Sequence, residues 1–553
     1  MKSFLHKTVV IALMAFWTVS CSEFLQEDPK GQIMDNLAFS QRSDLEGAVH
    51  ALNRQVLKGT KASITFEIVT AGDDASTHPA SNKAPRREFD NYDVSDTNSS
   101  MTIDTGSWYW LWKMIKAANY IINGVENTPD VTQEEIIFAL GQAYYWRAWA
   151  YFYLVREWGP VPKVVTEDID LSIEVSSVSD IFDLIVSDLK EAEKLPANYT
   201  AGPWAMNGVN VAVSKGAAQA TLAYVYLTMA GWPLNKGAEY YQLAANKALE
   251  VIDGAENGTY YYRLYDEYWK IHSKEYNLKN TEVILAVYYS TVTGTGDDSQ
   301  NARGCIEDIH EISGGYNSWR GEFAFYCDFP EGDRKDWTYA PVTYHVGKGE
   351  AYPWWSDEIP EEQRQPYFRK SAFTTDDNTA GTYEYDHYRS FESQSNGWGT
   401  QIHQTVRLAE VYCWYAEAVG RSGQTNSRAV ELLNRVRNRA NGADGPQNIY
   451  PSAMTPDELA EAAYNEHGWE IAGYYWGNFA ARYFDMHRMN RVRDHFEYRK
   501  RNPEREVVPG IFMKEPFGPS GEWDQTKMYL PYPAPDVRMN PNLANIDKLN
   551  LIY

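Results

Sequence analysis

The sequence predicts a mainly α-helical fold, in which paired helices form an α/α superhelical scaffold that holds one large, irregular, loop-rich lobe. Several segments repeat apolar residues with the 3.6-residue period of a helix, and neighbouring segments pair into hairpins. Three intervals between them are rich in Gly, Asp, Asn, Tyr and Trp: residues 60–107 (the first insertion), 254–404 (the later lobe) and 441–465. Long loops in a compact protein are usually functional.

One long helix is expected from residue 137 to residue 158. Its apolar side chains recur along one face, at Ile137, Leu140, Tyr144, Ala148, Tyr151, Val155 and Trp158. Residues 159–162 contain two prolines and end the helix, because proline has no amide proton to continue it. A second helix is expected to begin at Ser179, a favourable N-cap, and to end at Pro196.

Two helical hairpins are expected further along the chain. Residues 209–230 are nearly all apolar or small, which also fits a transmembrane helix, but Lys215 interrupts the run. An amphipathic partner over 244–252 follows a short turn, so a buried hairpin is the better interpretation. The second hairpin comprises residues 406–419 and 429–440. Small residues where the helices meet make both hairpins similar to tetratricopeptide (TPR) units, although their spacing is irregular.

The chain begins with the pattern of an exported lipoprotein. A basic stretch precedes an uncharged run over residues 9–19, which is too short to span a bilayer but typical of a signal peptide. The run ends in small residues before Cys21, as in a bacterial lipobox; in an ordinary signal peptide, that cysteine would be coincidental. We predict that residues 1–20 are removed and that Cys21 is acylated. One domain over 21–553 then remains, with an N-terminal part to about residue 230 and a C-terminal part from about residue 231.

The charge of the chain argues against one class of partner. The net charge is −24, and removal of residues 1–20 takes away two lysines and no acidic residue, which leaves −26. Nucleic-acid binding needs clustered Lys and Arg, so a nucleic-acid partner is not expected. Adsorption to anionic lipid is disfavoured for the same reason, so acyl chains would have to anchor the protein to the membrane.

Sequence motifs of catalysis and metal binding are absent. We find no GxSxG, HExxH, P-loop or GxGxxG motif and no Cys/His spacing of a zinc site. Acidic pairs such as Asp73-Asp74 could serve a glycosidase or hold calcium, but solvated loop charge is the simpler explanation among 75 acidic residues. No cofactor and no enzymatic activity are predicted. Cys305 and Cys327 could form a disulfide; otherwise both are packed or idle thiols.

Aromatic residues in the loops point to sugar binding. Aromatics make up 14% of the chain, with 40 Tyr and 19 Trp. A sugar ring has an apolar face and a rim of hydroxyl groups, so its capture calls for a flat aromatic side chain with polar groups at the edge. The later lobe offers such candidates at Tyr316, Trp319, Arg320, Trp354, Trp355 and Trp398. The alternative for each tryptophan is core packing.

Six motifs together identify a family by resemblance. They are Cys21-Ser22-Glu23-Phe24-Leu25 with Asp28-Pro29; Trp108, Leu111 and Trp112 with Ala118-Asn119; Ala143-Tyr144-Tyr145-Trp146-Arg147-Ala148 through Pro162; Arg407-Leu408-Ala409-Glu410-Val411 through Ala440; Phe484-Asp485-Met486-His487-Arg488; and Leu530-Pro531-Tyr532-Pro533 with Asn540-Pro541-Asn542-Leu543. In this order they resemble the SusD/RagB family. Physically, most of them are architecture: Arg147 and Arg407, in apolar surroundings, should pair with buried carboxylates or cap helix ends.

The resemblance implies a function and a second set of candidate residues. SusD-like proteins are lipid-anchored lids that capture oligosaccharide on the outer membrane and deliver it to a SusC-like TonB-dependent transporter. They usually carry part of their ligand surface in the first insertion, which here suggests Asp73, Asp74, Arg86, Tyr92 and Asn98. Oligopeptide capture, as in RagB-like members, is the alternative function. A glycoside hydrolase and a purely structural TPR scaffold are more distant alternatives.

Overall fold

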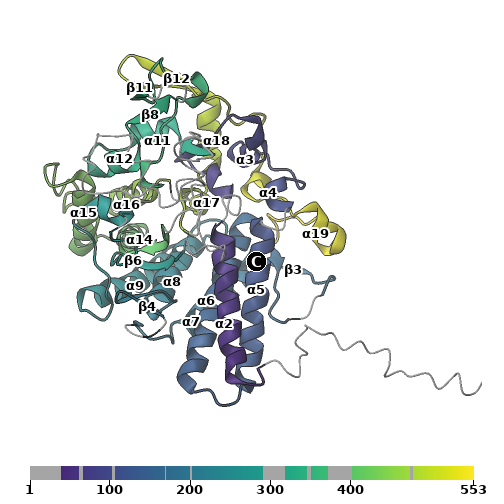
Figure 1. Cartoon of the computed structure of the whole chain (residues 1–553). Helices are drawn as coiled ribbons and strands as arrows, with labels where there is room; N and C mark the ends of the chain where they lie inside the picture. Colours follow the sequence, from purple (N-terminus) through teal and green to yellow (C-terminus); the bar gives the residue numbers. More distant parts are fainter. Residues whose placement is uncertain are drawn as a thin grey trace, which may run out of the picture.

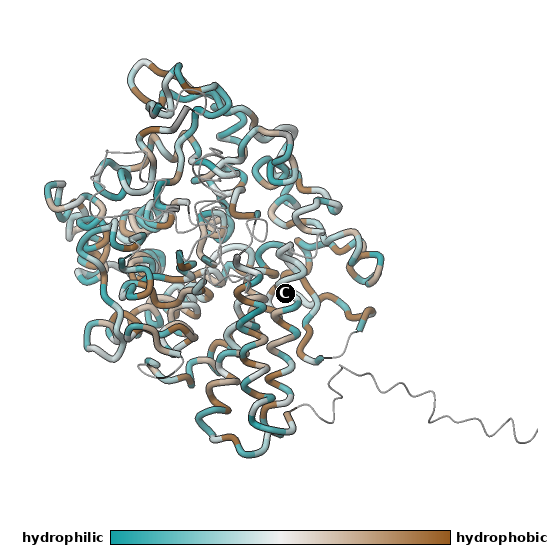
Figure 2. Tube along the Cα trace, viewed as in Figure 1, coloured by the Kyte–Doolittle hydropathy of each residue, from teal (hydrophilic) through white to brown (hydrophobic). Residues whose placement is uncertain are grey.

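The chain is mainly helical, as the sequence predicts, over the part that the computed structural model describes: residues 39–61, 67–102, 106–167, 170–199, 202, 204–273, 275–289, 318–345, 350–371, 401–473 and 478–553. Four long helices of the N-terminal part lie side by side (Figure 1): α2 (Arg42–Lys61), α5 (Ser107–Gly124), α6 (Gln133–Glu157) and α7 (Val178–Ala192). Apolar and polar residues alternate along them in Figure 2, as expected for helices with one buried face.

Helix α6 is longer than the apolar stripe that predicted it. It begins at Gln133, four residues before Ile137, because Thr132 and Glu135 form a capping box in which each side chain bonds the other residue's backbone amide. It ends at Glu157, directly before the Trp158-Gly159-Pro160 turn. The predicted N-cap of the next helix was wrong by two residues. Ser177 caps α7, and its hydroxyl accepts a hydrogen bond from the Asp180 amide at 3.1 Å.

The first predicted hairpin is formed by α8 (Lys215–Ala230) and α9 (Gly237–Glu256). Its first helix begins at Lys215, because residues 209–210 form strand β5, which pairs with β4 (Ala205–Met206). Every residue of α8 from Gly216 to Ala230 is buried within the protein, which explains the apolar composition of this segment. Among the described residues, no helix has the length and apolar character needed to cross a bilayer.

The second predicted hairpin is formed by α14 (Leu408–Arg421) and α15 (Ser427–Asn441). Helix α14 packs on α9 and on α16 (Pro456–Ile471), so the C-terminal helices continue the stack of the N-terminal ones. The helix starts at Leu408, because the preceding residues belong to β10 (His403–Arg407). This strand pairs antiparallel with β6 (Val283–Val287).

Gly420 sets the distance between α14 and α16. A Cβ atom at this position would lie 2.5 Å from the Pro456 carbonyl oxygen and 2.7 Å from the Ala460 amide nitrogen, both backbone atoms. We expect Gly420→Ala to lower the free energy of unfolding by about 1–3 kcal/mol in denaturant titrations, because the helices must move apart. Gly47→Ala in α2 is the matched control. Nothing lies within 4 Å of its Cβ, so it should raise stability by about 0.5–1 kcal/mol. Equal effects of the two substitutions would contradict this account.

Short elements make up the rest of the described chain. They are β1 (Ala75–Thr77), α3 (Ala84–Asp90), α4 (Ser99–Thr102), β2 (Val161–Pro162), β3 (Val175–Ser176), β7 (Trp319–Gly321), α11 (Phe323–Asp328), α12 (Asp333–Thr338), β8 (Val342–His345), β9 (Glu350–Pro353), α17 (Arg482–Arg488), α18 (Val492–Arg501), β11 (Glu504–Val508), β12 (Ile511–Lys514) and α19 (Ala534–Met539). The strands form two-stranded ribbons. One large hydrophobic cluster extends from Phe39 in the first described turn to Leu543 near the C-terminus.

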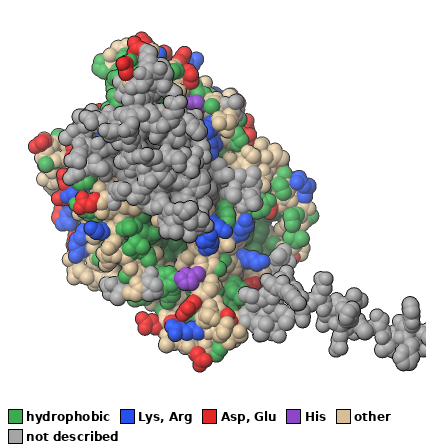
Figure 3. Space-filling view, in the orientation of Figure 1, with side chains coloured by type: hydrophobic (Ala, Val, Ile, Leu, Met, Phe, Trp, Pro, Cys, Tyr) green, Lys and Arg blue, Asp and Glu red, His purple; other side chains and the backbone are tan. Residues whose placement is uncertain are grey.

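Charged side chains occupy two different settings. On the face shown in Figure 3, acidic side chains are scattered along the outline, whereas several Lys and Arg side chains lie nearer the centre beside hydrophobic ones. Inside the protein, arginines pair with carboxylates. The Arg147 guanidinium in α6 donates to both oxygens of Asp188 in α7, at 2.7 and 2.8 Å, and to the Asn119 side-chain oxygen in α5 at 2.8 Å. The carboxylate pairing expected for Arg147 is therefore confirmed, and it joins three helices.

Candidate functional site

Strands β1 and β7 join the two segments from which the sequence predicts a ligand surface. β1 belongs to the first insertion and β7 to the later lobe, and they pair antiparallel with Ala75 opposite Gly321 and Thr77 opposite Trp319. The ribbon continues where the His78 amide donates to the Ser318 carbonyl oxygen at 3.2 Å. Residues 240 or more positions apart in sequence are thereby brought together.

The side chain of Arg86 links the same two segments by hydrogen bonds. Its Nε donates to Glu67 Oε1 at 2.8 Å, and its Nη1 donates to Ser318 Oγ at 3.0 Å. The guanidinium also lies over the Trp319 ring, 5.2 Å from its centroid. Burial raises the pKa of Glu67, even though the charge of Arg86 opposes that shift. Arg86 is partly exposed and held in a fixed orientation.

Asp73 and Asp74 turn to different partners and do not form a paired site. The Asp73 carboxylate is 23% exposed and makes a bidentate ion pair with Arg482 at 2.7 and 3.0 Å. Asp74 is buried and accepts a hydrogen bond from the Gly473 amide at 2.8 Å. Burial raises the pKa of Asp74 to about 7. The interpretation as solvated loop charge is thus wrong for Asp74. Within the described residues, no cluster of three or more His, Cys, Asp or Glu could hold a metal ion.

Tyr92 and Asn98 stabilise the conformation of the first insertion. The Tyr92 hydroxyl donates to the Ala71 carbonyl oxygen at 2.6 Å, and its backbone has a positive φ of 56°. The Asn98 amide donates to the Pro85 carbonyl oxygen at 2.9 Å and to Glu88 Oε2 at 2.7 Å. Both side chains are buried. The Tyr92 hydroxyl and the Asn98 amide group therefore already form hydrogen bonds inside the protein. A direct contact of either residue with a ligand stays a prediction.

The tryptophans of the later lobe divide into buried and partly exposed ones. Trp319 and Trp354 have no exposed surface, so core packing, the alternative left open by the sequence, describes both of them. Arg320 is buried too, and its Nη1 donates to the Glu362 carbonyl oxygen at 2.6 Å and to the side chain of Gln365 at 3.0 Å. Trp355 is partly exposed and lies perpendicular to Trp354, with ring centroids 5.2 Å apart.

Some of the predicted residues lie outside the described part of the chain. They are the lipidation site Cys21, the aromatic candidates Tyr316 and Trp398, and Cys305. Cys327, the other half of the disulfide left open by the sequence, is a free thiol whose Sγ lies 3.5 Å from the Glu506 carbonyl oxygen. Among the described candidates, Asp73, Arg86 and Trp355 retain exposed surface.

The C-terminal region supplies supporting residues that the sequence did not reveal. The Arg499 guanidinium donates to Asp90 Oδ1 at 2.5 Å, and the other oxygen of Asp90 accepts the Thr77 amide of β1 at 2.8 Å. Glu515 lies 3.4 Å from both the Ser76 hydroxyl and the Phe323 amide. Burial raises the pKa of Glu515 to about 7. Arg499 and Glu515 are more than 400 positions from β1, and no local pattern marks them. Arg482, the partner of Asp73, had a signal, because it precedes the motif Phe484-Asp485-Met486-His487-Arg488.

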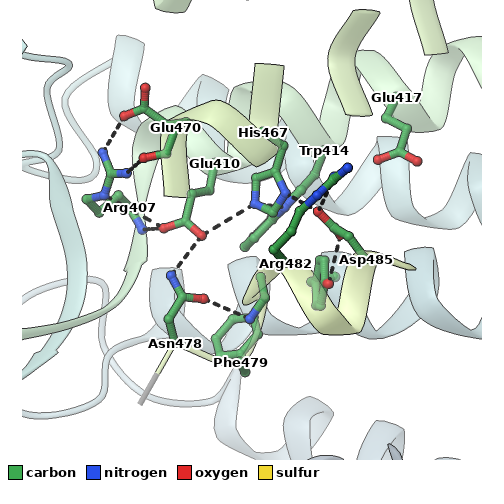
Figure 4. A network of polar contacts seen from close by, with 12 residues as sticks. Arg407, Glu410, Trp414, Glu417, His467, Glu470, Asn478, Phe479, Arg482 and Asp485 are labelled. Carbon is green, nitrogen blue, oxygen red and sulfur yellow. Dashed lines mark hydrogen bonds and ion pairs between the residues drawn. The ribbon is translucent and has the colours of Figure 1, made fainter. Parts of the chain in front are cut away.

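A buried network of charges lies where β10 meets α14 and α16 (Figure 4). Arg407 donates to Glu282 at 2.9 Å and to Glu470 at 2.7 Å, and its amide donates to Glu410 at 3.0 Å at the start of α14. The carboxylate pairing expected for Arg407 is therefore confirmed. Burial would raise the pKa of Glu470, but Arg439, Arg407 and Arg334 together hold it well below its usual range.

His467 and Asp485 form a pair of the kind that hydrolases use. His467 Nδ1 lies 2.6 Å from Asp485 Oδ2, and the Trp414 indole nitrogen lies 3.0 Å from His467 Nε2 (Figure 4). Burial would lower the pKa of His467, but Asp485 and Glu410 raise it to about 9. Neither the imidazole nor the Asp485 carboxylate has exposed surface, so a substrate cannot reach this pair. Its role in the described structure is to connect α16 with α17.

Comparisons with known proteins agree on one family. A family model described as "Starch-binding associating with outer membrane" matches residues 24–227, and one described as "SusD family" matches residues 281–548. SusD-like protein P2 of Formosa agariphila is 23% identical over 97% of each chain. The crystal structure of a SusD homolog from Bacteroides thetaiotaomicron, 18% identical, covers 92% of this chain and 98% of that chain with a TM-score of 0.71.

Two further solved structures share the fold. One is a crystal structure with xylogluco-oligosaccharide, at 21% identity and a TM-score of 0.66. The other is a laminarin binding SusD-like protein, at 20% identity and a TM-score of 0.66. Each covers 91% of this chain and 98% of its own. At these identities the structures establish the fold alone, and together with the family matches they lead to one statement: the chain belongs to the SusD/RagB family.

Proposed function

We propose that this protein captures oligosaccharide at the bacterial outer membrane and releases it unaltered. The observation that carries the proposal is the pairing of β1 with β7, which places the first insertion and the later lobe in one framework. Membership of a family associated with the outer membrane supports the location. The structurally similar proteins with xylogluco-oligosaccharide and laminarin support the ligand class.

The chemistry of the exposed candidates suits a sugar. Trp355 supplies a partly exposed indole on which the apolar face of a sugar ring can stack. Asp73 and Arg86 supply a carboxylate and a guanidinium for hydroxyl groups, and each is already oriented by an ion pair, with Arg482 and Glu67 respectively. Such preorganisation reduces the entropy lost when a ligand binds.

The membrane anchor and the transporter partner belong to the same proposal. Acylation of Cys21 would hold the protein at the membrane, and a SusC-like TonB-dependent transporter would receive the captured sugar. Mass spectrometry of the mature protein should find an N-terminal acylated Cys21, and a TonB-dependent transporter should co-purify from membranes. A different mature N-terminus, with no transporter in the preparation, would contradict this part of the proposal.

Sugar binding is tested by calorimetry of the purified protein against a panel that includes laminarin and xyloglucan oligosaccharides. We expect Trp355→Ala to weaken binding of the sugar that the protein selects by about 2- to 10-fold, because one stacking platform contributes about 0.5–1.5 kcal/mol. Trp269→Ala is the control. This indole is also partly buried but packs in a separate cluster with Tyr268 and Trp337, so its loss should leave affinity unchanged.

Two outcomes would contradict the proposed function, and a third would contradict the proposed ligand surface. Binding of peptides and of no glycan would favour the oligopeptide alternative, in which strand edges and charge pockets replace stacking platforms. Turnover of a glycan, abolished by substitution of one carboxylate, would establish a hydrolase. Unchanged glycan affinity after substitution of Trp355, Arg86 and Asp73 together would place the ligand surface elsewhere.

A further inference from the structure

Three carboxyl groups and one guanidinium group are buried where β1 meets β7. Asp90 ends α3, Glu322 follows β7, Glu515 follows β12, and Arg499 lies in α18. The four residues are between 0% and 9% exposed. Arg499 interacts electrostatically with all three carboxyl groups. The first insertion, the later lobe and the C-terminal segment therefore each contribute charged residues to one buried cluster.

Glu515 contacts both strands of the β1–β7 ribbon. Its carboxyl oxygens lie 3.4 Å from the Ser76 hydroxyl in β1 and 3.4 Å from the Phe323 amide, two residues after β7. The Gln365 side-chain nitrogen lies 3.5 Å away. These distances exceed the range of about 2.7–3.2 Å that is usual for hydrogen bonds to oxygen. Such long contacts compensate only weakly for the burial of an ionised carboxylate.

Glu322 links the later lobe to the first insertion. Its backbone amide donates to the carbonyl oxygen of Asp74, directly before β1, at 3.2 Å. Its Oε2 accepts the Phe325 amide at 2.7 Å and so caps α11. Burial raises the pKa of the Glu322 carboxyl, and the charge of Glu515 raises it further. The two glutamates therefore repel each other when both are ionised.

The single guanidinium group of the cluster cannot neutralise three carboxylates. Arg499 Nη1 donates to Asp90 Oδ1 at 2.5 Å and to the Asp90 carbonyl oxygen at 2.9 Å. Its Nε and Nη2 form no hydrogen bond with any described residue. Of the three carboxyl groups, only that of Asp90 lies within ion-pair distance of a described basic group. Two buried glutamates without a close counter-ion favour a proton on at least one of them.

We propose that protonation of the Glu322–Glu515 pair controls the β1–β7 junction. With a proton on the pair, Glu515 stays packed against both strands and holds the first insertion to the later lobe. When both glutamates are ionised, their repulsion and the cost of burying two charges open this contact. The junction is therefore closed at acidic pH and loosened at alkaline pH. A consequence for sugar capture rests on the proposed function, whereas the opening of the junction does not.

The direction of the pH dependence follows from linkage. Burial raises the pKa of both glutamates above the usual value of about 4.3, that of Glu515 to about 7. A carboxyl group with a raised folded-state pKa contributes stability that is fully present below its unfolded-state pKa. That stability is lost as pH rises toward the folded-state pKa. The stability of the junction should therefore decrease between about pH 5 and about pH 8.

The other titratable groups around the pair either keep their charge in this range or can be tested separately. Arg499 stays charged, because Asp90 and the two glutamates raise its pKa. Four groups titrate above this range, because burial raises each pKa from a starting value of 9 or 10: Tyr92, Tyr339, Tyr498 and Cys327. Burial also raises the pKa of Asp90, and that of Asp74 to about 7. The test therefore compares variants and does not depend on the profile of the native protein alone.

Hydrogen exchange of the full-length protein, measured by mass spectrometry at about pH 5.5 and about pH 8.5, tests the proposal. After correction for intrinsic exchange, protection of residues 75–77 and 319–321 should fall at least about 10-fold between the two pH values, since one pKa unit corresponds to a factor of 10. Glu515→Gln keeps the shape of the side chain and cannot ionise, so its protection should fall by no more than about 3-fold.

Two control variants should keep the full fall of the native protein. Glu504→Gln removes an exposed carboxylate from β11, the partner strand of β12. Asp74→Asn removes the neighbouring buried carboxyl with a raised pKa. Loss of the pH dependence in either control, with its retention in Glu515→Gln, would assign the effect to another group and overturn the proposal.

Glu322→Gln keeps the test decisive if Glu515→Gln fails to fold. Its side-chain oxygen can still accept the Phe325 amide, so the cap of α11 is kept, and the result should match that of Glu515→Gln. Protection that does not depend on pH in the native protein, or the full fall in both glutamine variants, would overturn the proposal.

Calorimetry with laminarin and xyloglucan oligosaccharides gives a separate readout. The affinity of the native protein for the one that binds should fall several-fold from about pH 5.5 to about pH 8.5, and that of Glu515→Gln should not. An affinity that stays constant while protection falls would refute the link between the junction and sugar capture. Failure of every glycan to bind would contradict the proposed function, and the exchange measurement would still decide whether the glutamate pair controls the junction.

Discussion

Glu470→Gln is expected to destabilise the protein by about 3–5 kcal/mol, because it removes one of the carboxylates that balance three buried arginines. Glu470 accepts hydrogen bonds from Arg407 at 2.7 Å, Arg439 at 2.6 Å and Arg334 at 3.0 Å. All four side chains are almost fully buried. With a neutral glutamine at this position, Glu282 and Glu466 remain as ion-pair partners of the three guanidinium groups, which are then in excess. The glutamine amide would also point N–H groups toward the arginines. Denaturant titration followed by circular dichroism measures the loss.

A matched control separates the burial of the charge from the charge itself. Glu431→Gln removes one partner of an exposed ion pair with Arg435, in which the side chains are 59% and 43% exposed. Exposed pairs contribute little, so we expect a change of less than about 1 kcal/mol. A similar loss of unfolding free energy in the two variants would contradict the expectation that the buried Glu470 network stabilises the protein more than an exposed ion pair does.

The effect of Glu470 also has a defined pH dependence. Its folded-state pKa is depressed by the three arginines, so its contribution to stability is present above the unfolded-state pKa of about 4.3. The contribution is lost as pH falls below that value toward the folded-state pKa. The difference in stability between the native protein and Glu470→Gln should therefore be constant near neutral pH and shrink in acid.

Arg147→Met is expected to cost a similar amount, about 3–5 kcal/mol, in the N-terminal part of the protein. The substitution removes two hydrogen bonds to Asp188 and one to Asn119, and so breaks the polar link among α5, α6 and α7. It leaves the Asp188 carboxylate buried, where burial already raises its pKa in the presence of the arginine. Arg428→Met, in an exposed ion pair with Asp253, should change stability by less than about 1 kcal/mol.

A double substitution tests whether the cost comes from the stranded charge. Replacing both partners of a buried pair with apolar residues is often nearly neutral, whereas removing one partner is strongly destabilising. We therefore expect the Arg147→Met, Asp188→Leu double variant to be at least about 2 kcal/mol more stable than Arg147→Met alone. Additive losses in the double variant would mean that packing around the pair, and not the unpaired charge, sets the cost.

Local patterns predicted the helices well and their ends less well. The apolar stripe from Ile137 identified α6, but the capping box at Thr132 extended the helix beyond the stripe. The second hairpin was expected from residue 406, yet residues 403–407 pair with β6 as a strand. Helix periodicity depends on neighbours three and four positions away. Where a helix begins also depends on capping contacts and strand pairs, and strand pairs can involve residues far away in sequence.

The candidate site illustrates the same limit more sharply. Composition marked the first insertion and the later lobe as loop-rich segments with many aromatic residues. The pairing of β1 with β7 brings these two segments together. Composition could not separate Trp354, which has no exposed surface, from its neighbour Trp355, which is partly exposed. It also gave no sign that Asp73 would pair with Arg482, 409 positions away.

Residue patterns along the chain were therefore sufficient for three conclusions. The family followed from the resemblance of six motifs, and the helical class followed from local periodicity. The need of Arg147 and Arg407 for buried carboxylates followed from the cost of burying a charge. The three-dimensional arrangement was needed to identify the carboxylates that pair with them and the aromatic rings that remain exposed. Exposure and ion pairing depend on contacts between distant segments, and such contacts form only when the chain folds.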